Sequence, residues 1–311
     1  MTAPSPQSPG LLNWLQILLL GVIWGAAFMG VSVALTGYSP MTVAAGRALI
    51  GAGVLIVAGY VVGQPVTRLG GKREWLIASV IGVVNVAAPF ALLGLGLQHV
   101  SSAFAGVIMG AVPILILPLV AVFSKDEGIG PRRVLGIFLG FTGVVVLIGP
   151  GIFASEGGRA ETLGRLAILG SACCYAVGSV MTRNAPKMPP IPFATATVIA
   201  GALAISPLAL ILDGIPDEYS ARATLGLLLT AIFPTALAVV LRVRVITSAG
   251  SLFMSNVSFL VPIWAVIFGI TLLGEEVPPQ LFVALGFVLS GIALSQWSAI
   301  RRQPQQRRKS R

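Results

Sequence analysis

Ten runs of mainly apolar residues divide this chain, and their length most constrains its fold. A helix rises about 1.5 Å per residue, so about 20 apolar residues are needed to cross the hydrocarbon core of a bilayer. Strands of a membrane barrel would instead show about ten residues of alternating polarity. The sequence therefore predicts an all-α integral membrane protein with ten transmembrane helices. Their expected ranges are 11–34, 41–63, 75–97, 101–123, 132–149, 163–183, 191–212, 223–245, 249–273 and 279–299.

The composition excludes a soluble fold. Hydrophobic residues make up 56% of the chain and charged residues only 10%, whereas a soluble domain takes about 25% of its residues from the charged types. The adjacent Cys173 and Cys174 lie inside an apolar run and provide no disulfide framework. The first apolar run exceeds the core of a signal peptide and has no basic residue before it, so we expect it to be retained as a helix.

Lys and Arg residues are distributed unevenly between alternate loops. Sixteen of the twenty lie on the side of the two termini, three lie on the other side, and Arg47 falls within a helix. Because cytoplasmic loops carry such an excess, we predict both termini in the cytoplasm and the protein in an inner membrane. The basic tail 301–311 suits an anionic lipid surface rather than nucleic acid, since no base-stacking element accompanies it.

The second half of the chain repeats the order of motifs in the first half. Pro113 is matched by Pro262, and Pro89 to Leu92 is matched by Pro234 to Leu237. Five helices per copy reverse the orientation of the second copy, which predicts inverted repeats around a central cavity, an arrangement typical of transporters. The expected organisation is a cytoplasmic tail 1–10, a repeat 11–150, an outer loop 151–162, a repeat 163–300 and a cytoplasmic tail 301–311.

These motifs resemble the EamA-type repeat of the drug/metabolite transporter superfamily. In the first half they are Trp24 to Phe28, Arg47, Ala91-Leu92 followed by Gln98 to Val100, Pro113, Glu127 and Gly136 to Gly143, and in the second Tyr175-Ala176 through Arg183, Pro262, Glu275 and Gly291. Within that superfamily the chain is similar to the YddG-like amino acid exporters. The resemblance implies a ten-helix carrier that moves small metabolites outward, with neutral or aromatic amino acids favoured and other drugs or metabolites, such as nucleotide-linked or cationic compounds, as the alternative.

The carboxylates all fall at or outside the expected helix ends. Proton and sodium carriers often use an acid within the membrane, because a buried carboxylate is retained where it binds the coupling ion. The sequence therefore predicts a facilitator or an exchanger, or a carrier whose proton coupling passes through the substrate.

Polar and aromatic residues inside the apolar runs form the expected substrate site. Lipid cannot satisfy the amides of Asn85 and Asn256, so these side chains should point inward. Arg47 could extend outward to the interface, pair with a helix C-terminus, or face the cavity and bind a substrate carboxylate, and the sequence leaves these open. The predicted substrate-binding residues are Trp24, Phe28, Arg47, Asn85, Phe90, Met109, Tyr175, Ser179, Ser255, Asn256 and Trp264.

Two prolines and one histidine are the expected moving parts. Pro113 and Pro262 remove backbone hydrogen bonds at matching places in the two repeats, which makes them hinge candidates. His99 is either a gate or substrate-contact residue or an interfacial residue hydrogen-bonded to loop backbone. The glycines Gly136, Gly140, Gly143, Gly286 and Gly291 should instead serve helix packing.

No cofactor or metal is expected. The chain has one His and two Cys, and it contains no phosphate-binding loop of the GxxxxGK[ST] form. An intramembrane enzyme is the alternative from another class, but Ser255 and Cys174 have no acid or base partner at midplane depth. The expected partners are a small-molecule substrate and membrane lipid, and the chain could be a monomer or a homodimer.

Overall fold

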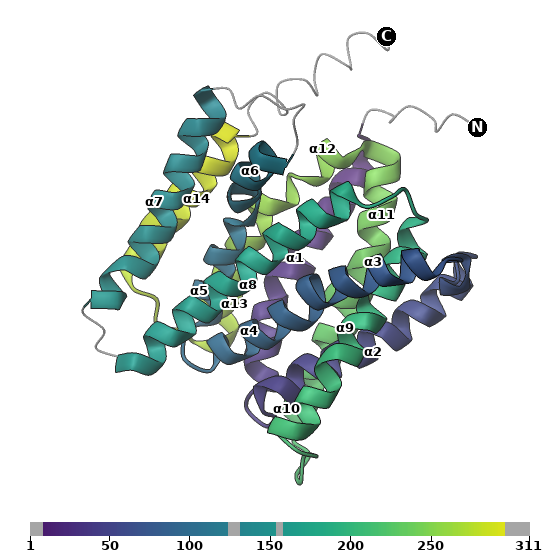
Figure 1. Ribbon diagram of the computed structural model, residues 1–311. Helices are drawn as coiled ribbons and strands as arrows, with labels where there is room; N and C mark the ends of the chain where they lie inside the picture. Colours follow the sequence, from purple (N-terminus) through teal and green to yellow (C-terminus); the bar gives the residue numbers. More distant parts are fainter. Residues whose placement is uncertain (1–8, 124–130, 154–157, 296–311) are drawn as a thin grey trace.

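The computed structural model describes residues 9–123, 131–153 and 158–295 (Figure 1). The basic tail 301–311, most of the segment 1–10, part of the loop 151–162, and Glu127 lie outside these ranges. Every regular element of the described residues is helical. The elements are α1 (Leu11–Ala34), α2 (Pro40–Val61), η1 (Val66–Arg68), α3 (Lys72–Gly82), η2 (Val83–Ala87), α4 (Ala88–Leu97), α5 (Ser102–Gly110), α6 (Val112–Phe123), α7 (Pro131–Phe153), α8 (Gly158–Asn184), α9 (Pro190–Leu212), α10 (Ala221–Thr230), η3 (Ala231–Leu237), α11 (Ala238–Ala249), α12 (Ser251–Met254), α13 (Val257–Leu273) and α14 (Pro279–Ser295).

Seven helical stretches of the described chain are long and apolar enough to cross a membrane. They are Leu11–Ala34, Pro40–Val61, Lys72–Leu97, Ser102–Leu119, Gly158–Asn184, Pro190–Leu212 and Ala221–Ala249. Three further apolar stretches of the described residues are shorter: Val257–Leu273, Pro279–Ser295, and Val134–Leu147, which lies within the 23-residue α7. The multi-pass helical fold is thereby confirmed, while a count of ten crossings depends on including the three shorter stretches.

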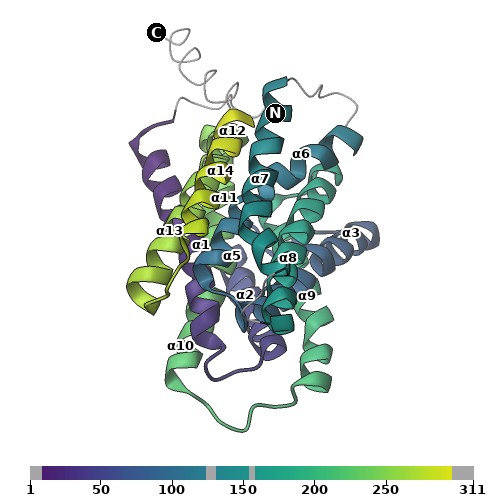
Figure 2. The ribbon, with the colours of Figure 1, turned by 90° about the vertical axis from the view of Figure 1, so that its left-hand side faces the viewer.

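Helices from the two halves of the chain pack against each other in reciprocal pairs. The first helix of the first half, α1, packs against α10, α11 and α13, and its counterpart α8 packs against α4, η2 and α6. Two helices also pack against their own counterparts in the other half: α2 packs against α9, and α7 packs against α14. The α7 and α14 pair lies at one side of the molecule, and the start of α1 and the end of α14 lie at the same end (Figures 1 and 2).

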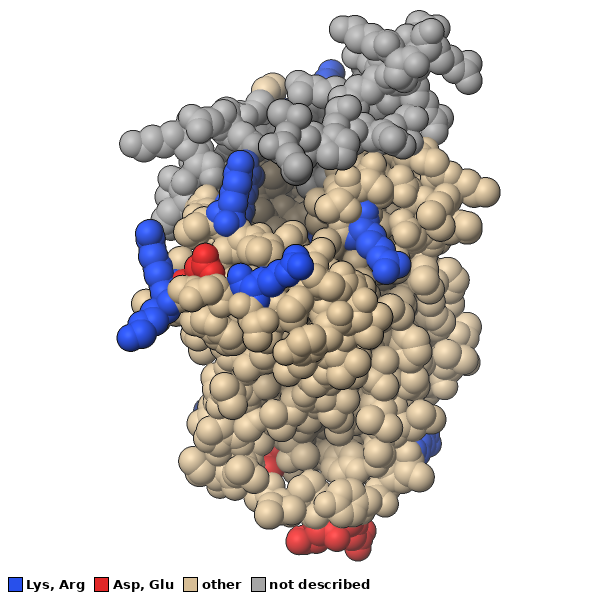
Figure 3. Space-filling view, turned by 90° about the vertical axis from the view of Figure 1, so that its right-hand side faces the viewer, with Lys and Arg blue, Asp and Glu red and all other residues tan. Residues whose placement is uncertain are grey.

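Small residues bring several of these pairs into backbone contact. In the α7 and α14 pair, a Cβ atom added to Gly136 would lie 2.7 Å from the carbonyl oxygen of Gly291, and the reverse substitution would give the same distance. Only residues without a side chain permit this approach, as in other membrane helix pairs. Most Lys and Arg side chains on the face shown in Figure 3 lie on its upper half, whereas an acidic group lies at its lower end.

Two π-helical segments interrupt corresponding helices of the two halves. Residues Val83–Ala87 form η2 between α3 and α4, and Ala231–Leu237 form η3 between α10 and α11. Pro89 follows η2 closely, and the matching Pro234 lies inside η3. Proline has no N–H to donate, so the preceding turn adopts another hydrogen-bond pattern, and π turns of this kind are frequent at functional sites. The sequence revealed the matching prolines but not the π turns.

Candidate functional site

Arg47 of α2 is a buried cation near the middle of the molecule. Its side chain is only 6% exposed, and its Nε donates a hydrogen bond of 2.9 Å to Oγ1 of Thr235 in η3. The guanidinium carbon lies 3.9 Å from the ring centroid of Phe90 in α4, a cation–π contact. No carboxylate of the described residues forms a salt bridge with Arg47. A guanidinium carries five N–H donors, so its terminal nitrogens retain the capacity to bind an anion.

The two residues that contact Arg47 occupy the same position in the two halves of the chain. Phe90 follows Pro89, and Thr235 follows the matching Pro234. Arg47 therefore joins the third helix of the first half to the third helix of the second half, through a ring on one side and a hydroxyl on the other. Thr235 Oγ1 is itself fixed, because it donates a 2.9 Å bond to the carbonyl oxygen of Thr230.

The carbonyl groups of the two matching prolines are bound in the same reciprocal way. Trp24 Nε1 of α1 donates to the carbonyl oxygen of Pro234 at 3.3 Å, and Ser171 Oγ of α8 donates to that of Pro89 at 2.9 Å. Each bond runs from the first helix of one half to the third helix of the other. These contacts satisfy backbone acceptors that lipid could not satisfy.

Asn85 lies in η2 and packs tightly against α8. Its Oδ1 is buried without a hydrogen-bond partner in the described structure. A Cβ atom added to Gly178 of α8 would lie 2.6 Å from that oxygen. Tyr175, one turn before Gly178, packs with Phe90 in one apolar cluster and lies near Arg47.

We call Arg47, Asn85, Phe90, Tyr175 and Thr235 the Arg47 cluster. Four of these residues belong to the predicted substrate site, and the structure brings them together from α2, η2, α4 and α8. Thr235 was not predicted, because only the fold places its hydroxyl beside a residue of another half. Its place in the repeated Pro234 to Leu237 motif was the one available signal.

Several other predicted site residues make structural contacts. Phe28 is 7% exposed and Met109 packs against the same core cluster. The Trp264 ring stacks on Phe268 with centroids 5.3 Å apart, and Ser179 Oγ donates to the carbonyl oxygen of Tyr175 at 2.7 Å. Ser255 and Asn256 occupy the turn between α12 and α13.

The hinge candidates lie in different local settings. Pro113 is the second residue of α6, just beyond the helix break at Ala111. Pro262 lies inside α13, which runs through it without interruption, and its ring packs on Gly110, where an added Cβ would be 2.9 Å away. His99 is exposed just past the end of α4. Two further departures from α-helical geometry, at matching places in the two halves, are η2 and η3.

Carboxylates of the described chain lie at helix ends or in loops, as the sequence predicts. Glu275 accepts hydrogen bonds from the backbone N–H groups of Ser102 and Ala103 at 2.7 and 3.0 Å, which caps α5. Asp213 accepts bonds from the backbone N–H and the hydroxyl of Thr42 at 2.8 and 3.1 Å, at the start of α2.

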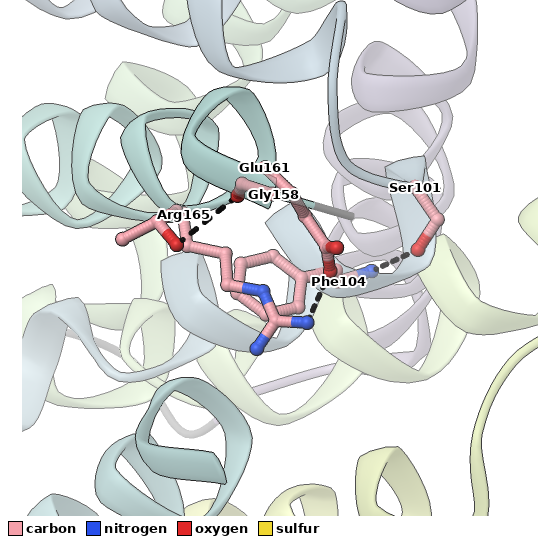
Figure 4. A network of polar contacts seen from close by, with 6 residues as sticks. Ser101, Phe104, Gly158, Glu161 and Arg165 are labelled. Carbon is pink, nitrogen blue, oxygen red and sulfur yellow. Dashed lines mark hydrogen bonds and ion pairs between the residues drawn. The ribbon is translucent and has the colours of Figure 1, made fainter. Parts of the chain in front are cut away.

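A third carboxylate, Glu161, pairs with Arg165 one turn further along α8 (Figure 4). The guanidinium of Arg165 lies 5.7 Å from the ring centroid of Phe104 in α5. Among the described residues no group of three His, Cys, Asp or Glu is placed to hold a metal ion.

A cavity of about 600 Å³ lies between α3 and the last turns of α8, with one residue of α6 in its wall. Arg73 and Asn184 contribute polar groups, and the remaining wall is mainly apolar. Ile81 and Met181 line the cavity, about one helical turn from Asn85 and Gly178 respectively.

Comparison with known proteins identifies relatives along the whole chain. The sequence profile of the EamA-like transporter family matches twice, at residues 12–149 and 162–297. A WAT1-related chloroplastic protein of Arabidopsis thaliana is 29% identical over 91% of this chain and 69% of its own length. The uncharacterized transporter YvbV of Bacillus subtilis is 27% identical, covering 93% and 92% of the two chains.

Two further comparisons bear on activity and fold. A protein of Chlamydia muridarum described as an S-adenosylmethionine/S-adenosylhomocysteine transporter is 26% identical over 89% of each chain. A solved crystal structure of 22% sequence identity aligns with a TM-score of 0.66, covering 93% of this chain and 98% of the other. At that identity the alignment supports the fold alone.

Proposed function

The chain belongs to the EamA-like transporter family, and from this premise we propose that it is a secondary carrier that exports small carboxylate-bearing metabolites by alternating access. Family membership makes the protein a multi-pass membrane transporter rather than an enzyme. The proposal adds the mechanism, the direction and the chemical class of the substrate. Neutral and aromatic amino acids are the substrates that it favours.

Ten crossings in two inverted five-helix repeats are part of the proposal. The twofold match of the family profile, the reciprocal helix pairs and the corresponding π segments support it. The excess of Lys and Arg on one side supports cytoplasmic termini in an inner membrane. The proposed substrate position is the Arg47 cluster, where the two halves meet.

The buried Arg47 guanidinium is the single observation that carries the substrate class. A buried charge is costly unless it is paired, yet Arg47 forms no salt bridge with a described carboxylate. A carboxylate of the substrate would supply that charge and would fit the planar donors of the guanidinium. The aromatic rings of Phe90 and Tyr175 and the free acceptor on Asn85 suit the remainder of an amino acid.

The alternatives differ in how well this chemistry fits. S-adenosylhomocysteine also carries an amino acid carboxylate, and one relative is described as its transporter, so it belongs among the compounds tested. A nucleotide-linked diphosphate would require more than one buried cation. A cationic drug would require a buried carboxylate, whereas the described carboxylates lie at helix ends or in loops.

The test is flux of labelled amino acids and S-adenosylhomocysteine into proteoliposomes. Arg47→Ala removes a charge-assisted interaction of about 1.5–3 kcal/mol, so KM for a transported carboxylate should rise about 10- to 100-fold. Arg47→Lys should restore little, since Lys lacks the planar fork. The control is Arg244→Ala, which removes an exposed guanidinium from α11. Equal KM values for Arg47→Ala and the control would refute the role of Arg47.

A further inference from the structure

We infer that the cavity between α3 and α8 is the cytoplasmic mouth of the substrate pathway, and that this structure is closed on the outer side. The inference rests on the proposed carrier function and topology, since it assigns the two sides of the membrane. It identifies where the substrate is loaded, which neither the family nor the relatives indicate.

The first argument is that corresponding helix contacts differ at the two ends of the molecule. Trp24 in α1 and Tyr175 in α8 belong to matching motifs, and Gly30 and Met181 lie at the same distance after them in the sequence. The contact between α1 and α10 therefore corresponds to the contact between α8 and α3. At the outer end α1 and α10 touch through backbone, because a Cβ on Gly226 would lie 2.8 Å from the carbonyl oxygen of Gly30.

The corresponding residues at the cytoplasmic end do not close in this way. Ile81 and Gly226 lie at the same distance before the matching prolines Pro89 and Pro234. The pair of Ile81 and Met181 therefore corresponds to the pair of Gly226 and Gly30. Both of these large side chains line the cavity of about 600 Å³. A cavity at one end therefore replaces a backbone contact at the other end.

Polar bonds between the two halves provide the second argument. At the outer end the Tyr38 hydroxyl and Thr224 Oγ1 are 2.5 Å apart, joining the loop after α1 to α10. Asp213 binds the start of α2, and Glu275 binds the start of α5. Each of these contacts connects the first half of the chain to the second, so together they hold the outer side shut.

The chemistry of the cavity fits its role as a mouth. The guanidinium of Arg73 could bind the carboxylate of an amino acid at the cytoplasmic entrance. The apolar wall formed by residues such as Ile77 and Val180 suits an uncharged or aromatic side chain. One helical turn from Ile81 and Met181 along their helices, Asn85 packs against Gly178.

The experiment measures which side of the membrane reaches this cavity. Single cysteines replace Ile77 and Met181 in a background with Cys173→Ser and Cys174→Ser, and a charged, membrane-impermeant maleimide is applied to inside-out or right-side-out vesicles. Val57→Cys is the control, because Val57 is 63% exposed at a similar depth of α2 but does not line the cavity. A charged reagent reaches only thiols in contact with water.

We expect Met181→Cys and Ile77→Cys to react about tenfold faster than Val57→Cys in inside-out vesicles, and slowly from the other side. Adding Tyr38→Phe and Thr224→Val, which loosen the outer contact, should lower the cytoplasmic reactivity of Met181→Cys. Reaction from the outside, or reaction no faster than that of Val57→Cys, would overturn the inference.

Two readouts separate this inference from the proposed function. Cysteine reactivity requires no substrate, so it tests the mouth even if no amino acid is transported. If amino acids are transported, the bulky maleimide on Met181→Cys should abolish flux while the same label on Val57→Cys leaves it unchanged. Undiminished flux through labelled Met181→Cys would exclude the cavity from the pathway without affecting the carrier proposal.

Discussion

Replacing Glu275 by Gln tests whether a carboxylate from the second half of the chain stabilises α5 as a charged helix cap. The carboxylate accepts bonds from Ser102 N–H at 2.7 Å and from Ala103 N–H at 3.0 Å. These groups belong to the first turn of α5, which has no carbonyl of its own to offer them. The cap also places a negative charge at the positive end of the helix dipole.

The loss of stability in the Glu275→Gln variant depends on which hydrogen bonds its neutral amide can still form. The amide oxygen can accept from one backbone N–H, but the NH₂ group is a donor and faces the second one. The variant therefore loses one charge-assisted bond of about 1.5–3 kcal/mol, together with a dipole interaction of about 0.3–1 kcal/mol. A total of about 2–4 kcal/mol corresponds to a fall in Tm of about 5–10 °C.

The assay is thermal unfolding of purified protein in detergent, followed by loss of the monodisperse peak. Glu276→Gln is the matched control, because the same chemical change is made one residue away on an exposed side chain. Its Tm should stay close to that of the unaltered protein. If Glu275→Gln unfolds at the same temperature as Glu276→Gln, the carboxylate does not stabilise α5.

Three further predictions concern packing and transport. Gly178→Ala should lower the free energy of unfolding by about 1–3 kcal/mol through overpacking, because the new Cβ would lie 2.6 Å from Asn85 Oδ1. The control Gly286→Ala should be tolerated, because nothing lies within 4 Å of its Cβ. Equal melting temperatures of the two variants would contradict the contact. Pro262→Ala should change the maximal flux while membrane insertion, judged by yield, is unaffected, and unaltered kinetics would remove this proline from the mechanism. An imposed pH gradient should leave the initial flux of a neutral amino acid unchanged, and uphill accumulation driven by the gradient would reveal a coupling site.

The helices could be predicted because lipid imposes a local requirement on the sequence. Each apolar run must satisfy its backbone within itself, so length and hydropathy locate it without knowledge of its neighbours. The ends of α1, α2 and α9 fall close to the expected positions for this reason, whereas α8 begins at Gly158, before the expected start at residue 163. Of the shorter apolar stretches, Val257–Leu273 begins after the turn at Ser255 and Asn256, whereas Val134–Leu147 lies within α7, a continuous helix of 23 residues.

The contacts within the candidate site depended on the fold and were less predictable. The sequence identifies Arg47 as an unusual cation within an apolar run but leaves open whether it has a structural partner or binds substrate. Its hydrogen bond to Thr235 was not predictable, because it joins residues from different halves of the chain. The repeated proline motif predicted related helices but not π turns, because the hydrogen-bond pattern depends on side chains that reach nearby carbonyls, as the Thr235 hydroxyl reaches the Thr230 carbonyl. Pro262 illustrates the reverse case, since α13 accommodates it without a break.

The backbone contact between α7 and α14 limits how the two halves could move. Gly136 and Gly291 touch through their main chains, and this pair stands at one side of the molecule (Figure 1). Surfaces without side chains can rotate over one another, yet any separation would lose dispersion contacts that lipid tails replace only poorly. The seam would therefore act as a fulcrum: rocking about it widens one end of the protein while narrowing the other, so that both ends are not open at once.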